Sequence, residues 1–256
     1  MGRFRDLIGW PPPRRAAVPA GMRVYAIGDV HGRADLLQPL LGWIAEDHAR
    51  RGGEAALHIV ALGDLIDRGP ASAKVIDLFA ADTRRNAHYS FLSGNHEEML
   101  LAILDGEAEG VPDWLDHGGA ETLESYGVDP ARFWDDPEAL PRVLRAALPS
   151  RHIAFLRAMR DQVRIGDYLF VHAGIRPGVP IDEQEGRDLR WIRKEFLTSH
   201  VDHGPVVVHG HTIVPKVDYR RNRIAIDTGA YRTGRLTALG LEGEARWTLT
   251  SRLDEA

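Results

Sequence analysis

Side chains that can ligate metal ions follow apolar runs at three places in the first hundred residues. Each place combines a glycine with an acid or an amide, in the order Gly28-Asp29-Val30-His31-Gly32, Gly63-Asp64-Leu65-Ile66-Asp67-Arg68-Gly69 and Gly94-Asn95-His96-Glu97. The preceding runs, 24–27, 58–62 and 89–92, have the length and the β-branched or aromatic character of buried strands. Because loops at the carboxyl ends of neighbouring strands turn toward one crevice, we expect these side chains to form a single metal site.

The same arrangement returns in the second half of the chain. There the runs 168–171 and 206–208 lead to His172-Ala173-Gly174 and His209-Gly210-His211-Thr212. Five strand ends therefore offer six candidate ligands, Asp29, His31, Asp64, Asn95, His172 and His211. Carboxylate, amide and imidazole groups suit Mn²⁺, Fe²⁺ or Zn²⁺, and the sequence contains no Cys that would supply a thiolate. Six ligands exceed what one tetrahedral ion takes, so we expect two divalent ions about 3.5–4 Å apart, bridged by one carboxylate.

The composition fits one globular domain without a strongly basic surface. The 256 residues carry a formal net charge of −5, and the sequence pI is about 6.2, which argues against binding to nucleic acid. The sequence contains no run of ~20 apolar residues, so we expect no membrane partner. Residues 1–20 are rich in proline, lack the apolar core of a secretory signal and predict a flexible or extended arm. Together with the absence of Cys, this favours a cytoplasmic protein.

Helix and strand signals alternate through the first half of the sequence. Helical patterns at 33–51, about 71–81 and about 95–104 follow the three strands, which predicts β–α units with helices outside a sheet. From about 105 to 160 the pattern is helical, and we expect an insertion within a single domain spanning 21–256. Strands return at 162–165, 168–171, 205–208, 223–226, 236–241 and 245–250. Their short turns predict a second, more antiparallel sheet packed on the first.

In this order, the motifs resemble those of the phosphoprotein phosphatase branch of the calcineurin-like metallophosphoesterases, especially the bacterial and phage serine/threonine-type phosphatases. The resemblance covers about residues 22–250. It implies an α/β fold in which a β-sandwich of two mixed sheets is flanked by helices, in four α/β/β/α layers. It also implies two divalent ions, with Mn²⁺ favoured and Fe or Zn as alternatives, and a phosphorylated protein or peptide as the substrate, with small phosphate esters as further substrates.

Carried over position by position, the resemblance assigns the six candidate ligands to two ions. Asp29 and His31 would bind one ion, and Asp64 would bridge it to the second. The second ion would take its remaining ligands from three later positions, Asn95, His172 and His211.

The resemblance also implies roles for four catalytic side chains. Arg68 and Arg193 would bind phosphoryl oxygens, because a planar guanidinium can meet two oxygens at once. His96 would protonate the leaving oxygen, and Asp67 would orient its ring. The implied reaction is in-line attack on phosphorus by a hydroxide held between two ions, without a phosphoenzyme.

Two other functions stay open at this point. Related enzymes with the same metal motifs hydrolyse dinucleoside polyphosphates, as a symmetrical diadenosine tetraphosphatase does. The Asp67-Arg68-Gly69 stretch favours the protein phosphatase, because those hydrolases are expected to lack this acid. A non-catalytic binding module with the same fold is the third alternative, and the complete ligand set argues against it.

Three further features have more than one interpretation. His209 could approach the ions, line the substrate cleft or support a ligand, and we leave it out of the ligand set. Asp227 ends a strand and could face the site, but we favour a role in which it stabilises a turn through its own backbone. The segment 114–127 resembles a stretch of the bacterial phosphatases and could form either ordinary helix packing or a wall of the substrate site.

Overall fold

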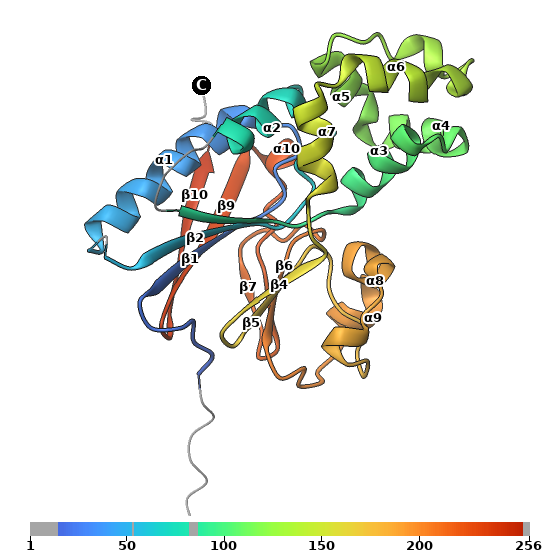
Figure 1. Ribbon diagram of the computed structural model, residues 1–256. Coiled ribbons are helices and arrows are strands. Elements are labelled where there is room, and N and C mark those ends of the chain that lie inside the picture. Colours follow the sequence, from blue (N-terminus) through green and yellow to red (C-terminus); the bar gives the residue numbers. More distant parts are fainter. Residues whose placement is uncertain (1–14, 53, 82–86, 253–256) are drawn as a thin grey trace, which may run out of the picture.

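Two five-stranded sheets lie face to face at the centre of the molecule, and helices cover their outer faces (Figure 1). The computed structural model describes residues 15–52, 54–81 and 87–252. The two sheets and their flanking helices give the four α/β/β/α layers, so the predicted fold class is confirmed.

The first sheet contains the three strands that precede the early motifs. Its members are β1 (Met22–Ile27), β2 (Ala56–Ala61), β3 (Ala87–Phe91), β9 (Arg235–Glu242) and β10 (Ala245–Arg252), in the order β10-β9-β1-β2-β3. β1, β2 and β3 are parallel, whereas β9 runs antiparallel to β1 and to β10. The parallel strands therefore deliver their following loops to one edge of the sheet.

The second sheet is also mixed. It contains β4 (Gln162–Ile165), β5 (Tyr168–Val171), β6 (Val206–His209), β7 (Asp218–Tyr219) and β8 (Arg223–Ala225), in the order β4-β5-β6-β8-β7. β5, β6 and β8 are parallel, and the edge strands β4 and β7 are antiparallel to their neighbours. Parallel pairing is possible because long connections separate β5 from β6 and β6 from β8.

The expectation of a more antiparallel second sheet that takes in the last two strands is wrong. β9 and β10 do pair through the short turn at Gly243, as their spacing predicts. They extend the first sheet, however, because β9 pairs with β1. A short turn determines which strand is the local partner, but it carries no information about the sheet that the hairpin joins.

Alternation along β1 divides the buried side chains between two cores. Val24 and Ala26 face the second sheet, where Phe170 and Val208 belong to the same buried cluster. Tyr25, Ile27 and Ile59 instead pack with the apolar side of α1 (Ala34–Arg50) and with α2 (Ser72–Ala81). On the far side, α8 (Gly186–Trp191) and α9 (Lys194–Leu197) cover the second sheet through Leu189 and Phe196.

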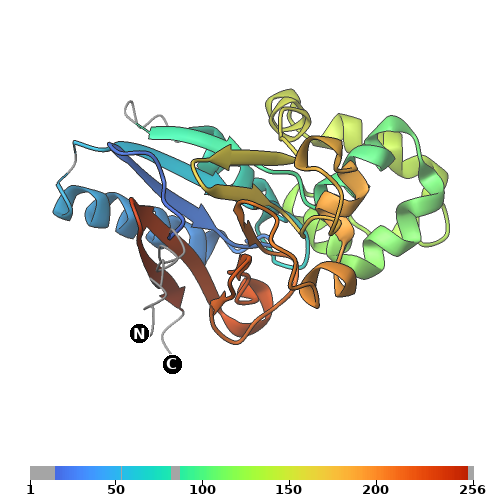
Figure 2. The same cartoon turned by 90° about the horizontal axis from the view of Figure 1, so that it is seen from below.

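Between β3 and β4 the chain forms a succession of helices. They gather at the end of the molecule opposite the C-terminal end of α1, as both ribbon views show (Figures 1 and 2). In chain order they are α3 (Asn95–Asp105), η1 (Ala108–Gly110), α4 (Val111–Trp114), the π-helix η2 (Leu115–Gly119), α5 (Ala120–Ser125), η3 (Ala131–Phe133), η4 (Pro137–Ala139), α6 (Leu140–Ala147) and α7 (Ser150–Arg157). Two short helices lie elsewhere, η5 (Ile181–Glu183) and α10 (Ala230–Thr233).

The expected N-terminal arm at residues 1–20 lies mostly outside the described residues. Its last part packs on the second sheet, since the backbone N–H of Ala17 donates to Asp167 Oδ2 at 3.0 Å. Val18 is buried and its N–H donates to the carbonyl oxygen of Gly243. Residues 17 and 18 are therefore part of the packed structure.

Candidate metal centre

All six predicted ligands follow the carboxyl ends of parallel strands. In the first sheet, β1, β2 and β3 lead to four of them, Asp29, His31, Asp64 and Asn95. In the second sheet, β5 and β6 lead to the other two, His172 and His211. All six side chains are buried, and the contacts below join the loops of both sheets into one cluster.

His172 lies at the centre of one group of ligands. Its Nε2 lies 3.1 Å from Asn95 Oδ1 and 3.4 Å from Asp64 Oδ2. The same atom lies 3.1 Å from Nδ1 of His211. On the other side of the ring, Nδ1 lies 2.9 Å from the carbonyl oxygen of Leu62, which directs Nε2 toward the cluster.

Asp64 connects this group to a second one. Its Oδ2, which faces His172, also lies 3.5 Å from Nε2 of His31 and 3.9 Å from Nε2 of His96. One carboxylate oxygen thus faces both groups, which is the placement that a bridging ligand requires. Asp29 enters from another side, since its two oxygens accept the backbone N–H of His211 at 3.2 and 3.0 Å.

The backbone is strained at the residues that form the site. Five non-glycine residues of the described chain have positive φ, between 46° and 70°: His31, Asp64, Asp67, Arg68 and His211. Such conformations cost on the order of 1–3 kcal/mol each and persist only where the surrounding structure holds them. All five belong to the predicted ligand or catalytic set, so the fold accepts this cost to aim their side chains.

Glycines in the motifs make room for the carboxylates. A Cβ on Gly94 would lie 2.1 Å from Oδ1 of Asp64, and a Cβ on Gly210 would lie 2.0 Å from Oδ1 of Asp29. Both approaches are far closer than van der Waals contact allows. Glycine at these positions is therefore needed for close approach to the acids.

Asp64 dominates the electrostatics of the cluster. Burial raises the pKa of its carboxyl, but His172 and His96 outweigh burial and hold this pKa well below its usual range. Burial likewise lowers the pKa of His172, and the charge of Asp64 reverses this and raises it to about 10. Burial lowers the pKa of His31 to about 3, and the nearby His96 and Arg68 also lower this pKa against the opposing charge of Asp64. Asp64 is therefore anionic, and its charge raises the pKa of the neighbouring His172.

His96 and Asp67 form a buried pair beside Asp64. Nδ1 of His96 lies 2.7 Å from Oδ2 of Asp67, and the same oxygen accepts the indole N–H of Trp114 at 2.9 Å. The hydroxyl of Thr122 donates to Oδ1 of Asp67 at 2.6 Å. Burial lowers the pKa of His96, but Asp64 and Asp67 outweigh it and raise this pKa above its ordinary value. A positioned imidazole with a raised pKa can supply a proton to a leaving group.

The two predicted arginines lie on opposite sides of the cluster. Nη1 of Arg68 lies 3.0 Å from Nε2 of His31, and Nε of Arg193 donates to Nε2 of His211 at 2.9 Å. The guanidinium of Arg68 also lies 4.8 Å from the ring centroid of Tyr231. Both cations border the ligand atoms, where they can reach the oxygens of a phosphoryl group.

Several supporting residues are absent from the predicted site. Glu97 accepts the backbone N–H groups of Gly94, Asp64 and Leu65 at 2.8, 2.9 and 2.7 Å, so it ties the start of α3 to the Asp64 loop. Its signal in the sequence is an acid three residues after the glycine that precedes a helix, as in a capping box. Tyr231, which packs on Arg68, follows Asp227-Thr228-Gly229-Ala230 and had no recognisable signal.

The structure shows the contacts of the three features that have more than one interpretation, His209, Asp227 and the segment 114–127. His209 turns its ring edge toward Phe196 at 5.1 Å between centroids and carries its Nδ1 3.1 Å from the carbonyl oxygen of Gly210. Asp227 accepts the N–H of Gly229 at 2.8 Å, as expected of a turn residue. In the segment 114–127, Trp114 and Thr122 contact Asp67, so this segment takes part in building the site.

The chemistry of the cluster fits two divalent ions. The groups His31, Asp64, His96 and Asp64, His172, His211 each bring their ligand atoms within 4.8 Å of one another. Among the described residues, Nε2 of His96 is a buried polar atom without a hydrogen-bond partner, and it faces Asp64. When bound, the ions would neutralise phosphoryl charge and lower the pKa of a water molecule.

The chain belongs to the calcineurin-like phosphoesterase family, whose sequence profile matches residues 22–237. Its relatives include the bis(5'-nucleosyl)-tetraphosphatase PrpE (asymmetrical) of Anoxybacillus flavithermus, at 28% identity over 83% of this chain and 88% of the relative. The enzyme of the same name from Geobacillus thermodenitrificans is 29% identical over 85% and 90%. A symmetrical bis(5'-nucleosyl)-tetraphosphatase of Neisseria meningitidis is 30% identical, over 64% of this chain and 48% of the relative.

Solved structures show the same fold. A crystal structure assigned to a diadenosine tetraphosphatase superposes with a TM-score of 0.59 at 21% identity, covering 94% of this chain and 100% of the other. The cold-active protein-tyrosine phosphatase of a Shewanella species gives a TM-score of 0.52 at 18% identity, covering 92% of this chain and 82% of the other.

No helix in the described part of the chain is long and apolar enough to cross a membrane.

Proposed function

We propose that this protein is a metal-dependent hydrolase that cleaves dinucleoside tetraphosphates asymmetrically. The observation that carries this proposal is the name shared by the Anoxybacillus and Geobacillus relatives, which match this chain over 88% and 90% of their own lengths. The symmetrical enzyme matches over only 48% of its length, which favours asymmetrical cleavage. The motifs alone favour a protein phosphatase, with a symmetrical dinucleoside polyphosphate hydrolase as the alternative. We propose the dinucleoside polyphosphate hydrolase instead, and with asymmetrical rather than symmetrical cleavage.

The proposed site assigns each side chain a role in this hydrolysis. The six ligands Asp29, His31, Asp64, Asn95, His172 and His211 would hold two divalent ions, for which Mn²⁺ stays the expected choice. Arg68 and Arg193 would bind oxygens of the phosphoryl group under attack, because both lie against the ligands.

The reaction exchanges one bond to phosphorus for another. A water oxygen bonds to phosphorus, and one P–O bond of the phosphoanhydride breaks, with the electron pair leaving on the departing nucleotide. The protons of the water pass to the solvent or to the two nucleotide products. Asymmetrical cleavage of a tetraphosphate chain therefore gives a nucleoside triphosphate and a nucleoside monophosphate. Positioning and charge neutralisation supply most of the rate in such a transfer, and the cluster provides both.

A phosphoprotein phosphatase is the second candidate, and one observation favours it. His96, held by Asp67 at 2.7 Å, is placed to protonate a leaving oxygen. An alkoxide from serine needs this proton, whereas a departing phosphate is a better leaving group.

A substrate panel on the Mn²⁺-loaded protein separates the two candidates. We expect kcat/KM for diadenosine tetraphosphate to exceed that for phosphoserine and phosphotyrosine peptides at least about tenfold, with ATP and AMP as products on ion-exchange chromatography. The variant Asp64→Asn serves as the control for contaminating hydrolases. Faster turnover of a phosphopeptide would contradict the proposal, and ADP as the only nucleotide product would contradict asymmetrical cleavage.

A further inference from the structure

A cavity of about 540 Å³ lies between α8 and the helices α3, η1 and α4. One wall comes from α3, through Met99, Ala102 and Ile103. The opposite wall comes from α8, through Arg187 and Trp191. The volume falls in the range of small-molecule sites, about 300–1,000 Å³.

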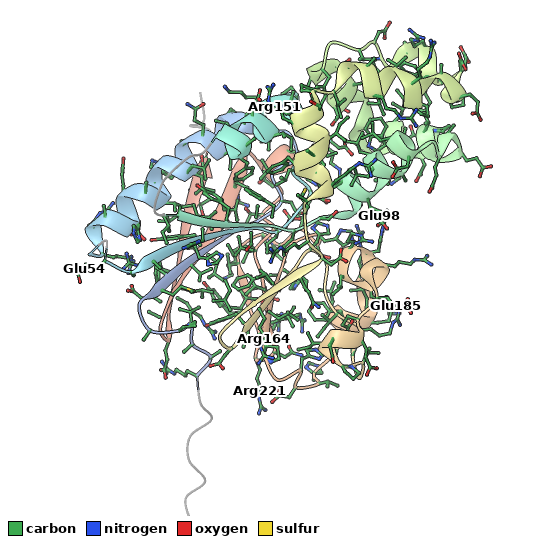
Figure 3. All side chains as sticks on the ribbon, viewed as in Figure 1. Glu54, Glu98, Arg151, Arg164, Glu185 and Arg221 are labelled. Carbon is green, nitrogen blue, oxygen red and sulfur yellow. The ribbon has the colours of Figure 1, made fainter. Side chains whose placement is uncertain are left out.

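Both walls of the cavity belong to segments of the chain that also carry residues of the candidate metal centre. α3 begins with Asn95 and His96, and Met99 lies one helical turn further along, a rise of about 5–6 Å. Trp191 precedes Arg193 by two residues, and Arg193 contacts His211. Figure 3 places Glu98 where α3 meets the α8–α9 side of the molecule. A ligand bound at the ions could therefore extend directly into the cavity.

Trp191 gives the cavity a fixed aromatic surface. Its side chain is 40% exposed, so the ring is available for contact with a ligand. Its indole N–H donates to Oε2 of Glu98 at 2.5 Å, while Oε1 of Glu98 accepts Nη2 of Arg190 at 3.0 Å. These bonds hold the ring in one orientation before a ligand arrives, so little conformational entropy is lost on binding.

The charges around the cavity distinguish it from the phosphate site. Glu98, Glu107 and Asp113 line it together with the single cation Arg187 among its described lining residues. An excess of carboxylates repels a polyphosphate chain, but carboxylates accept hydrogen bonds from hydroxyl and amino groups. The phosphates belong at the ions and at Arg68 and Arg193, and an uncharged hydroxyl-bearing group with a flat ring belongs here.

We infer that this cavity is the subsite for one nucleoside of the substrate, with the base stacked on Trp191 and the sugar hydroxyls directed to the carboxylates. The inference rests on the proposed function, because it places the nucleoside next to the phosphate that the ions would hold. Stacking on an aromatic ring is available to every base, so the subsite accepts both purine and pyrimidine nucleosides.

The test compares Trp191→Ala with a matched surface tryptophan. Trp43, on α1, is 41% exposed and lies outside the cavity lining, so Trp43→Ala is the control. For Trp191→Ala we expect KM for diadenosine tetraphosphate to rise at least about tenfold, with kinetics on p-nitrophenyl phosphate changed less than about twofold. Trp191→Phe should restore most of the loss. Ala102→Phe, which fills the cavity from α3, should raise the same KM.

Binding of adenosine provides a readout that does not depend on turnover. In isothermal titration we expect adenosine to bind the wild type and Trp43→Ala, and to bind Trp191→Ala at least about tenfold more weakly. If diadenosine tetraphosphate is not hydrolysed but adenosine binding depends on Trp191, the proposed function fails and the nucleoside subsite stands.

Three results would overturn the inference while leaving the proposed function intact. One is hydrolysis of diadenosine tetraphosphate with an unchanged KM in Trp191→Ala. Another is an equal loss on p-nitrophenyl phosphate, which would show that Trp191 acts through Arg193. The third is a combined result in which adenosine does not bind but KM for a phosphopeptide rises in Trp191→Ala. This result would show that the cavity binds a peptide rather than a nucleoside.

Discussion

Asp64 is the residue on which the contacts of the metal centre converge. Its Oδ2 lies within 4.0 Å of imidazole nitrogens of three residues, His31, His96 and His172. Its backbone N–H is held by Glu97, and its φ of 49° is in the left-handed region. A side chain placed between two groups of candidate ligands in this way would affect both ions at once.

Replacing Asp64 by Asn should therefore remove both ions. We expect Asp64→Asn to lose most of its bound Mn²⁺ after gel filtration, because the bridging charge is gone, whereas Asp29→Asn loses only one ion per chain. Elemental analysis of the two variants and the wild type measures the ratio. Unchanged stoichiometry in Asp64→Asn would show that this carboxylate bridges nothing.

His96 gives a second prediction at this scale. His96→Asn should keep its metal content but lose about 10²–10⁴ in kcat on an alkyl phosphate, since no proton reaches the leaving alkoxide. The loss on p-nitrophenyl phosphate should be much smaller, because nitrophenolate leaves without a proton. Parallel kinetics on the two esters test this, and equal losses would exclude His96 as the acid.

At the scale of elements, the helices between β3 and β4 support the loop between β2 and α2 that contains Asp67 and Arg68. In the π-helix η2, the carbonyl oxygen of Gly118 accepts the N–H of Arg68 at 3.0 Å. Gly118 has a φ of 102°, and a Cβ there would lie 2.5 Å from the backbone nitrogen of Arg68. η2 thus holds this loop in place from outside the sheets.

This contact predicts a site-specific effect of Gly118→Ala. We expect kcat/KM to fall at least about tenfold, because the methyl group must displace Arg68, while metal content is retained. Gly127→Ala is the matched control, since Gly127 also has a positive φ, 75°, but open space around its Cβ position. Steady-state kinetics with circular dichroism of both variants checks this. Similar activity losses in the two would mean that backbone strain alone is responsible.

Local signals predicted most elements well. β4 and β5 have the predicted bounds, and α3 begins at Asn95 as its pattern indicates. β7, with two residues, was not predicted, because so short a strand has no periodicity. The placement of β9 and β10 could not be predicted either, since it depends on pairing between β9 and a strand some 200 residues earlier.

Within the site, too, features with a local sequence signal were predicted, and features that depend on distant contacts were not. The predicted ligands stand in short motifs after strands, and a motif is a local signal. The contacts of Trp114 and Thr122 with Asp67 span 47 and 55 residues and involve ordinary packing residue types. Only the folded chain could show that these residues support the site.

At the scale of the whole molecule, the metal centre joins the two sheets. The first sheet contributes Asp29, His31, Asp64 and Asn95, and the second contributes His172 and His211. Ions held by this set would connect segments that lie more than 180 residues apart in the sequence, such as Asp29 and His211. Metal binding would therefore be coupled to the stability of the entire fold.

Thermal unfolding measures this coupling. At Mn²⁺ concentrations about 100 times Kd, we expect about 2.7 kcal/mol of added stability for each ion, and two ions then raise Tm by about 10–20 °C over the chelated protein. Glu46→Gln, an exposed substitution on α1, should show the same rise. Asp64→Asn should show little of it, and a full rise in this variant would place the stabilising ions elsewhere.

The claim on which the rest depends is a pair of ions bridged by Asp64. Crystals grown with Mn²⁺ and measured near the manganese absorption edge test it most directly. We predict two anomalous peaks about 3.5–4 Å apart, both in contact with Asp64, one beside Asp29 and His31 and the other beside Asn95, His172 and His211. A single peak, or peaks away from Asp64, would contradict the dinuclear site.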